Sequence, residues 1–289
     1  MRKKSIKIIS VIFICIAIIF VIYKIDTINE TKERMVKVAK YLMNSISAED
    51  YEEIRLNVKK TDGTELSNQE LANFLLNTGL YRAMFIDTDE PSFTYSTNVN
   101  FFNTNKGTIS FSYKALNGDS ITNELEYYDA GTQEYFITND IKESDKEIKK
   151  YPFAKDLANG KDIDYKEDID EDIIFFKYKM IQDANKDFYL EIFEESKEDI
   201  KISMFNMLDK NFKYIENKYK YEWNDDCSIV SVYFNSINEP AFVKNLFIST
   251  TSMLCSTTIQ ALNGNPDWHL TINYYDYNTK ELLKTEKIR

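Results

Sequence analysis

The 289-residue chain is acidic, with a formal net charge of −11; its first thirty residues contribute +3, so the remaining 259 carry −14. A surface of this sign repels nucleic acid and anionic lipid headgroups, which argues against a nucleic-acid-binding protein. Tyrosine and phenylalanine together number 39, which excludes a disordered chain and provides core material for two domains of ordinary size.

An apolar segment near the N-terminus predicts a membrane helix. Residues 8–23 contain no charged side chain, and the preceding tail, residues 1–7, carries four positive charges. Sixteen helical residues rise about 24 Å, which approaches the ~30 Å hydrocarbon core of a bilayer. The segment ends in bulky residues, whereas a signal-peptidase site requires small ones. An uncleaved anchor is therefore favoured over a cleaved signal peptide or a helix buried in a cytoplasmic protein.

The positions of the positive charges predict which side of the membrane each part occupies. Positive residues beside an apolar segment are retained in the cytoplasm. We therefore expect a single-pass protein of the cell membrane, with residues 1–7 as a cytoplasmic tail, residues 8–23 as the transmembrane anchor and the bulk of the chain outside the cytoplasm.

Residues 30–140 are predicted to form an α+β module that begins with helices. Apolar residues recur at three- and four-residue steps from Met35 to Ile46, which indicates one apolar helical face. Ser67 and Glu70 have the spacing of a capping box, which opens another helix, and Gly79 is a suitable end for it.

The apolar period in this module then changes from 3.6 to 2. Aromatic and aliphatic residues alternate with polar ones between residues 93 and 137, and Asn117-Gly118 is a strong hairpin signal. This pattern predicts an antiparallel meander with one solvent-exposed face. Helices followed by a curled meander resemble the order of cone-shaped α+β folds.

A charged stretch separates this module from the next. Residues 141–172 lack apolar periodicity, and seven of the eleven residues from 162 to 172 are acidic. A solvated linker is the favoured interpretation. Weak calcium association is the alternative, although the run lacks the glycine and the spacing of an EF-hand loop.

Residues 173–289 are predicted to form a second α+β module, again with helices packed on an antiparallel sheet. Alternating strands open it, and a helix follows near residues 204–215. Its best-marked helix lies between Pro240 and Gly264, because proline suits the first helical turn and glycine the end. Strands on either side of residue 278 end the chain.

The chain lacks the motifs of most catalytic and cofactor sites. His269 is its only histidine, and no HExxH motif, G-x-S-x-G elbow or glycine-rich phosphate loop is present. We therefore predict no cofactor and no metal, and a structural role for His269 on the solvent-exposed face of a strand. Cys255 is predicted to be a small core residue and Cys227 a turn residue, with a disulfide between them as the alternative.

Aromatic residues on the predicted solvent-exposed face of the C-terminal strands are the best candidates for a functional surface. Tyr275 and Tyr277 alternate with inward-facing neighbours, and exposed aromatic residues often mark a binding surface. The alternative is that the chain itself covers both faces of these strands.

These observations favour a non-enzymatic, membrane-anchored binding or scaffold protein of the cell envelope, whose partner is a protein or a cell-wall component. Two alternatives remain. One is a cell-wall hydrolase that uses a carboxylate pair, since 47 acidic residues exclude no such pair. The other is a bitopic subunit of a secretion or conjugation machine.

Overall fold

The computed structural model describes the chain except residues 1, 87–92, 154–178, 183–187, 214–219 and 235–240, and gives only the backbone elements of residues 2–13, 179–182 and 241–247. The chain divides into two compact units, Met1–Ser144 and Asp145–Arg289. Both contain helices and sheets, which confirms the predicted α+β class. Each unit is described by itself.

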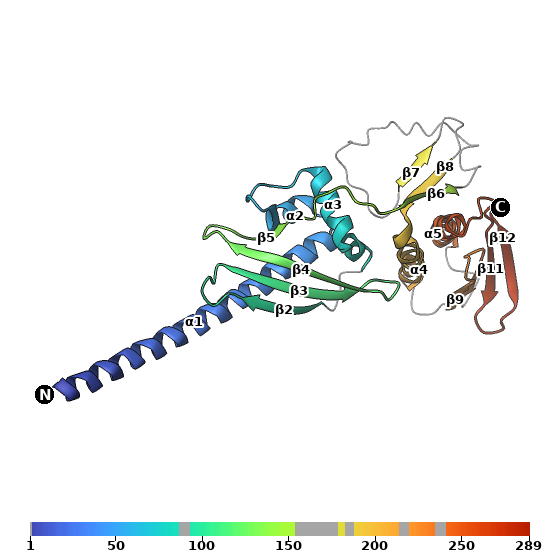
Figure 1. Ribbon diagram of the computed structural model, residues 1–289. Coiled ribbons are helices and arrows are strands. Elements are labelled where there is room, and N and C mark those ends of the chain that lie inside the picture. The colour runs from blue at the N-terminus through green and yellow to red at the C-terminus, as the bar shows by residue number, and fades with distance from the viewer. Residues whose placement is uncertain (1, 87–92, 154–178, 183–187, 214–219, 235–240) are drawn as a thin grey trace. The chain divides into compact units, whose positions relative to one another are not determined.

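Unit 1 begins with the long helix α1 (Arg2–Ser47), whose C-terminal part enters the core and whose N-terminal part extends beyond it (Figure 1). The buried face carries residues three or four apart, from Met35 and Val38 to Leu42 and Ile46, as the sequence predicts. Within the residues that the structure describes, no helix is both long and apolar enough to cross a membrane. The predicted anchor, residues 8–23, lies partly outside them.

The other helices of unit 1 follow the predicted start and stop signals. Ser67 and Glu70 form the capping box, in which Glu70 Oε2 accepts a bond from Ser67 N at 2.8 Å and Ser67 Oγ accepts one from Glu70 N at 3.3 Å. Gly79 ends the helix with a positive φ of 70°. The elements are α2 (Tyr51–Asn57), α3 (Asn68–Thr78) and the 3-10 helix η1 (Leu80–Phe85).

The capping box predicts a pH dependence of stability. Hydrogen bonds from Ser67, together with Lys60, hold the pKa of Glu70 below its usual value in the folded protein. This contribution is therefore present above the unfolded pKa and is lost as the pH falls through the folded pKa. We expect Glu70→Gln, which can still accept a hydrogen bond, to flatten the acid limb of the unfolding free energy measured by urea titration at several pH values. An unchanged acid limb would contradict this role.

The sheet of unit 1 has five strands in the order β1-β5-β4-β3-β2. Strands β2 to β5 form the predicted antiparallel meander, and β1 pairs with β5 in parallel, so the prediction of a wholly antiparallel sheet is wrong here. Strand β1 has only three residues, too few to show a period, and it joins the sheet at one edge. The bounds are β1 (Val58–Lys60), β2 (Thr94–Val99), β3 (Lys106–Lys114), β4 (Ser120–Asp129) and β5 (Glu134–Thr138).

Unit 2 contains two sheets, whereas the sequence predicts one. A three-stranded antiparallel sheet has the order β6-β8-β7, and a four-stranded sheet has the order β12-β11-β10-β9. The bounds are β6 (Ile148–Phe153), β7 (Lys179–Gln182), β8 (Phe188–Phe193), η2 (Glu194–Ser196), α4 (Lys197–Lys213), β9 (Lys220–Trp223), β10 (Ile229–Phe234), α5 (Ala241–Leu262), β11 (Thr271–Asp276) and β12 (Leu282–Lys287).

Strand β6 lies within residues 141–172, where the sequence predicts a linker. Strand β6 is an edge strand, and edge strands tolerate proline, here Pro152, and charged side chains. A lysine of β6 pairs with a carboxylate of the neighbouring strand: Lys150 Nζ lies 3.6 Å from Glu191 of β8. The acidic run at 162–172 lies outside the described residues.

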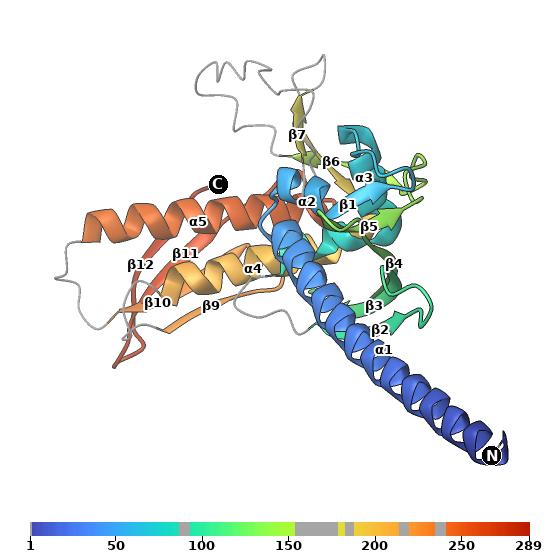
Figure 2. The ribbon, with the colours of Figure 1, turned by 90° about the vertical axis from the view of Figure 1, so that its left-hand side faces the viewer.

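The four-stranded sheet is mixed, which corrects the prediction of an antiparallel one. Strands β10 and β11 are parallel because α5 connects them, and a crossing helix returns the chain to the end where β10 began. Helices α4 and α5 lie side by side against one face of this sheet (Figures 1 and 2). On that face Phe212 of α4 stacks on Tyr221 of β9, with 5.0 Å between ring centroids.

Candidate binding surface

The face of the four-stranded sheet away from α4 and α5 carries a row of side chains, one from each strand. Strand register places Tyr233 opposite Tyr275, Lys220 opposite Tyr233, and Leu282 opposite Tyr275. Paired residues point to the same face, and their sequence neighbours point to the other. The alternation predicted for Tyr274 and Tyr275 is thus present: Tyr274 is buried and Tyr275 is half-buried on the opposite face.

Tyr233 and Tyr275 of this row, with Tyr277 just beyond β11, form what we call the tyrosine surface. Tyr233 and Tyr275 are stacked, with ring centroids 5.1 Å apart and planes at 20°. Tyr277 follows β11, is 39% exposed, and is held beside β10 by a 2.7 Å bond from its backbone N–H to the carbonyl of Phe234.

The turn between β11 and β12 places a lysine on the tyrosine surface. Asp276 Oδ1 accepts bonds of 2.8 Å from the backbone N–H groups of Asn278 and Thr279, and these bonds hold the pKa of Asp276 below its usual value. Lys280 then adopts a left-handed conformation, with φ of 61°. Its ammonium lies 4.2 Å from the ring centroid of Tyr277 and 5.1 Å from that of Tyr233, within cation–π range.

A second lysine borders the tyrosine surface from β9. Lys220 Nζ lies 5.5 Å from the Tyr233 ring and pairs with Glu222, which accepts a 3.2 Å hydrogen bond from the Tyr233 hydroxyl. The hydrogen bond to Glu222 raises the pKa of Lys220, and the bond from Lys220 lowers the pKa of Glu222. Both groups therefore stay charged near neutral pH and form an ion pair at the edge of the tyrosine surface.

Sequence reasoning identified Tyr275 and Tyr277 but missed Tyr233, Lys220 and Lys280. Tyr233 lies in a segment whose alternation of apolar and polar residues indicates which side chains face outward. Its proximity to Tyr275 depends on the parallel pairing of β10 with β11, which the sequence does not reveal.

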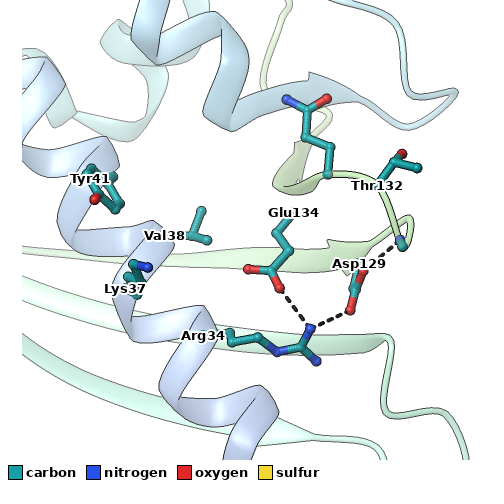
Figure 3. Close-up of a pocket in the computed structure, with 9 residues that line it drawn as sticks. Arg34, Lys37, Val38, Tyr41, Asp129, Thr132 and Glu134 are labelled. Carbon is teal, nitrogen blue, oxygen red and sulfur yellow. Dashed lines mark hydrogen bonds and ion pairs between the residues drawn. The ribbon is translucent and has the colours of Figure 1, made fainter.

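A shallow hollow of about 430 Å³ lies in unit 1 between α1 and the β4–β5 hairpin (Figure 3). Arg34 projects from α1 toward the hairpin, where Nη1 lies 2.9 Å from Asp129 Oδ2 and 2.8 Å from Glu134 Oε1. The two carboxylates neutralise Arg34 and point at it instead of at a ligand. Asp129 also accepts a 2.7 Å bond from Gly131 N, which fixes the turn. The hollow is therefore best explained as part of the packing contact between α1 and the β4–β5 hairpin.

The cysteines proposed as a disulfide are both buried, free thiols in unit 2. Burial, with a smaller effect of Asp226, raises the pKa of Cys227 to about 12. Burial also raises the pKa of Cys255, to which the nearby Cys227 contributes, and Cys255 Sγ donates to the carbonyl of Met204 at 3.4 Å. Protonated, buried thiols are poor nucleophiles. The disulfide between Cys227 and Cys255 stays a prediction.

His269 is exposed between buried Trp268 and Leu270, as the alternation predicts, but it precedes β11 and does not lie in a strand as expected. Its main chain has the structural role: the carbonyl accepts a 2.8 Å bond from Gln260 Nε2, and the N–H donates to Gln260 Oε1 at 3.1 Å. Gln260 thereby ties α5 to the segment that precedes β11.

The surroundings of several carboxyl groups among the described residues displace their pKa from the usual value. Where surroundings displace their pKa, the displacement is downward, because hydrogen bonds donated to these groups outweigh the effect of burial; the groups are Asp62, Glu70, Asp119, Glu194, Asp209, Glu222, Asp226 and Asp276. A general acid needs the opposite shift. In the same part of the chain, no three His, Cys, Asp or Glu residues gather in a group that could hold a metal ion.

Comparisons with models of protein families, with curated proteins and with solved structures find no match to this chain.

Proposed function

We propose that this chain is a binding or scaffold protein of the cell envelope, tethered to the cell membrane by residues 8–23, with both units outside the cytoplasm. The tyrosine surface is the single observation that carries the binding role. It presents a stacked tyrosine pair, a third exposed tyrosine and two lysines on a rigid sheet. Aromatic residues are enriched where proteins bind other molecules.

The tether is supported by the sequence and by the exposure of the helix that contains it. Residues 8–23 are uncharged, and from residue 14 onward the apolar side chains of this segment are exposed, with Ile19 at 66% and Tyr23 at 66%. Exposed isoleucine and phenylalanine on all sides of a helix are unfavourable in water and favourable in lipid.

The partner is a protein or a cell-wall component. Aromatic side chains pack against sugar rings and against apolar protein side chains, and Lys280 suits an acidic group beside either. A wall hydrolase is the less favoured alternative, because the observation that carries the proposal is an aromatic pair and not a pair of carboxyl groups. A bitopic subunit of a secretion or conjugation machine would use the same tether and the same surface.

The test is binding by residues 24–289, which retain every buried residue of the described core. We expect co-sedimentation with purified cell walls, or capture of one envelope protein, to weaken about 30-fold for Tyr275→Ala and for Tyr277→Ala, as a hot spot of ~2 kcal/mol implies. Tyr275 lies on the sheet surface and Tyr277 in the turn after β11, so circular dichroism should be unchanged.

Tyr41→Ala is the matched control, because Tyr41 is a 57% exposed tyrosine of α1 in the hollow of unit 1. It should bind as the wild type does. Loss of binding with Tyr41→Ala but not with Tyr275→Ala would move the site to that hollow. Release of soluble wall fragments, abolished by one Asp or Glu substitution, would instead establish the hydrolase.

A further inference from the structure

The loop between β2 and β3 presents an aromatic pair to solvent. The side chain of Phe102 is 89% exposed, and its ring meets that of Phe101 edge to face, with centroids 5.4 Å apart. Asn100 Oδ1 accepts bonds from the backbone N–H groups of Phe102, at 2.8 Å, and Asn103, at 3.3 Å. The loop is thus held in a turn that keeps Phe102 away from the core of unit 1.

Contacts within unit 1 show that β3 runs alongside α1 in the same direction. Gly107, near the start of β3, lies against Met35: a Cβ added there would be 3.0 Å from Met35 Cε. Near the end of the strand, the Tyr113 hydroxyl donates to the carbonyl of Gly79, where η1 begins. Ser47, the last residue of α1, donates to the carbonyl of Ala83 in η1. The later part of β3 therefore lies toward the C-terminal end of α1.

The lengths of the two elements agree with this alignment. Six strand residues from Gly107 to Tyr113 span about 20 Å, and twelve helical residues from Met35 to Ser47 span about 18 Å. The loop before β3 therefore projects past Met35. Figure 1 shows this loop on the side of the sheet toward the N-terminal part of α1.

The same measure gives the distance from Phe102 to the proposed membrane. Helix α1 is continuous, so no hinge separates the apolar segment from unit 1. The twelve residues from Tyr23 to Met35 rise about 18 Å, and the loop, which extends roughly three residues beyond Gly107, covers about 10 Å of this. The remaining ~8 Å is comparable to the ~5–8 Å headgroup layer on each side of a bilayer.

We propose that the Phe101–Phe102 loop is a second membrane contact, which inserts into the headgroup region of the bilayer that holds the anchor. The inference rests on the proposed tether. A single helix leaves the tilt and rotation of unit 1 free, and an interfacial aromatic contact at a distance from the helix axis restricts both. The partner is the lipid interface itself, since the loop combines an exposed phenylalanine with a position at the membrane-facing end of the sheet.

The test places a tryptophan at the loop of the full-length protein in phosphatidylcholine vesicles that carry bromine on the acyl chains. Zwitterionic lipid avoids repulsion of the acidic chain. We expect the indole emission added by Phe102→Trp to be blue-shifted and quenched. Lys114→Trp, at the exposed far end of the same strand, is the matched control and should add emission that is neither shifted nor quenched. The native Trp223 and Trp268 contribute the same background to both variants.

Flotation of the vesicles separates a failure of the loop contact from a failure of the tether. Protein that floats while the Phe102→Trp emission stays unquenched overturns the loop contact and leaves the tether standing. Quenching of both tryptophans overturns the orientation, because the whole sheet would then lie on the lipid. Protein that does not float overturns the tether and this inference together.

Discussion

Removal of residues 1–23 is expected to transfer the protein completely from the membrane fraction to the soluble fraction. Twelve of the sixteen residues from 8 to 23 are isoleucine, valine or phenylalanine. At −0.3 to −0.6 kcal/mol each in a membrane centre, they favour insertion by roughly 4–7 kcal/mol before any contribution from the positive tail. Full-length protein should therefore resist carbonate extraction of membranes, and residues 24–289 should not sediment with them.

The same preparation tests the orientation. Protease added to intact protoplasts should digest both units of the full-length protein, because the positive tail holds the N-terminus in the cytoplasm. Protection of the units from external protease would show that the orientation is the opposite of the one proposed. Extraction of the full-length protein by carbonate would contradict the proposed membrane tether. The binding role of the tyrosine surface would still be open to its own test.

Replacement of Phe136 by alanine is expected to cause a large loss of stability in unit 1. Phe136 is fully buried on β5, between β1 and β4, and its ring meets that of Tyr127 with centroids 6.3 Å apart. Removing a buried phenylalanine ring costs about 3–5 kcal/mol, because the transfer free energy is lost and a cavity remains. Urea denaturation of residues 24–289, followed by far-ultraviolet circular dichroism, measures this loss.

Tyr127→Phe is the matched control at the neighbouring ring. The Tyr127 hydroxyl is buried, and burial, with Glu134 next in effect, raises its pKa. Glu134 lies near enough to act on the hydroxyl, although the geometry between the two groups is not that of a hydrogen bond. Removing an unpaired buried hydroxyl should be neutral or slightly stabilising. A cost of ~1 kcal/mol or more for Tyr127→Phe would mean that the hydroxyl donates to Glu134, since that is the typical net value of a hydrogen bond. Equal costs for both variants would contradict the assignment of Phe136 to the centre of the core.

The features that the sequence determined by itself are local ones. The capping box of Ser67 and Glu70 and the end of α3 at Gly79 involve residues within a few positions of one another, and backbone preferences decide them. The meander was predictable for a related reason, because alternation fixes which side chains face the core, and the Asn117-Gly118 turn fixes the pairing of β3 with β4.

The features that only the tertiary structure decided join residues far apart in the chain. Arg34 meets Asp129 and Glu134 across 95 and 100 residues, and no local pattern selects that pair of carboxylates among 47 acidic residues. Likewise, Tyr275 was predictable as an outward-facing side chain, but its stacking on Tyr233 required α5 to cross the sheet and pair β10 with β11 in parallel. Periodicity determines the face on which a side chain lies. The strand that lies beside it is decided by long-range packing, whose free energy depends on the whole fold.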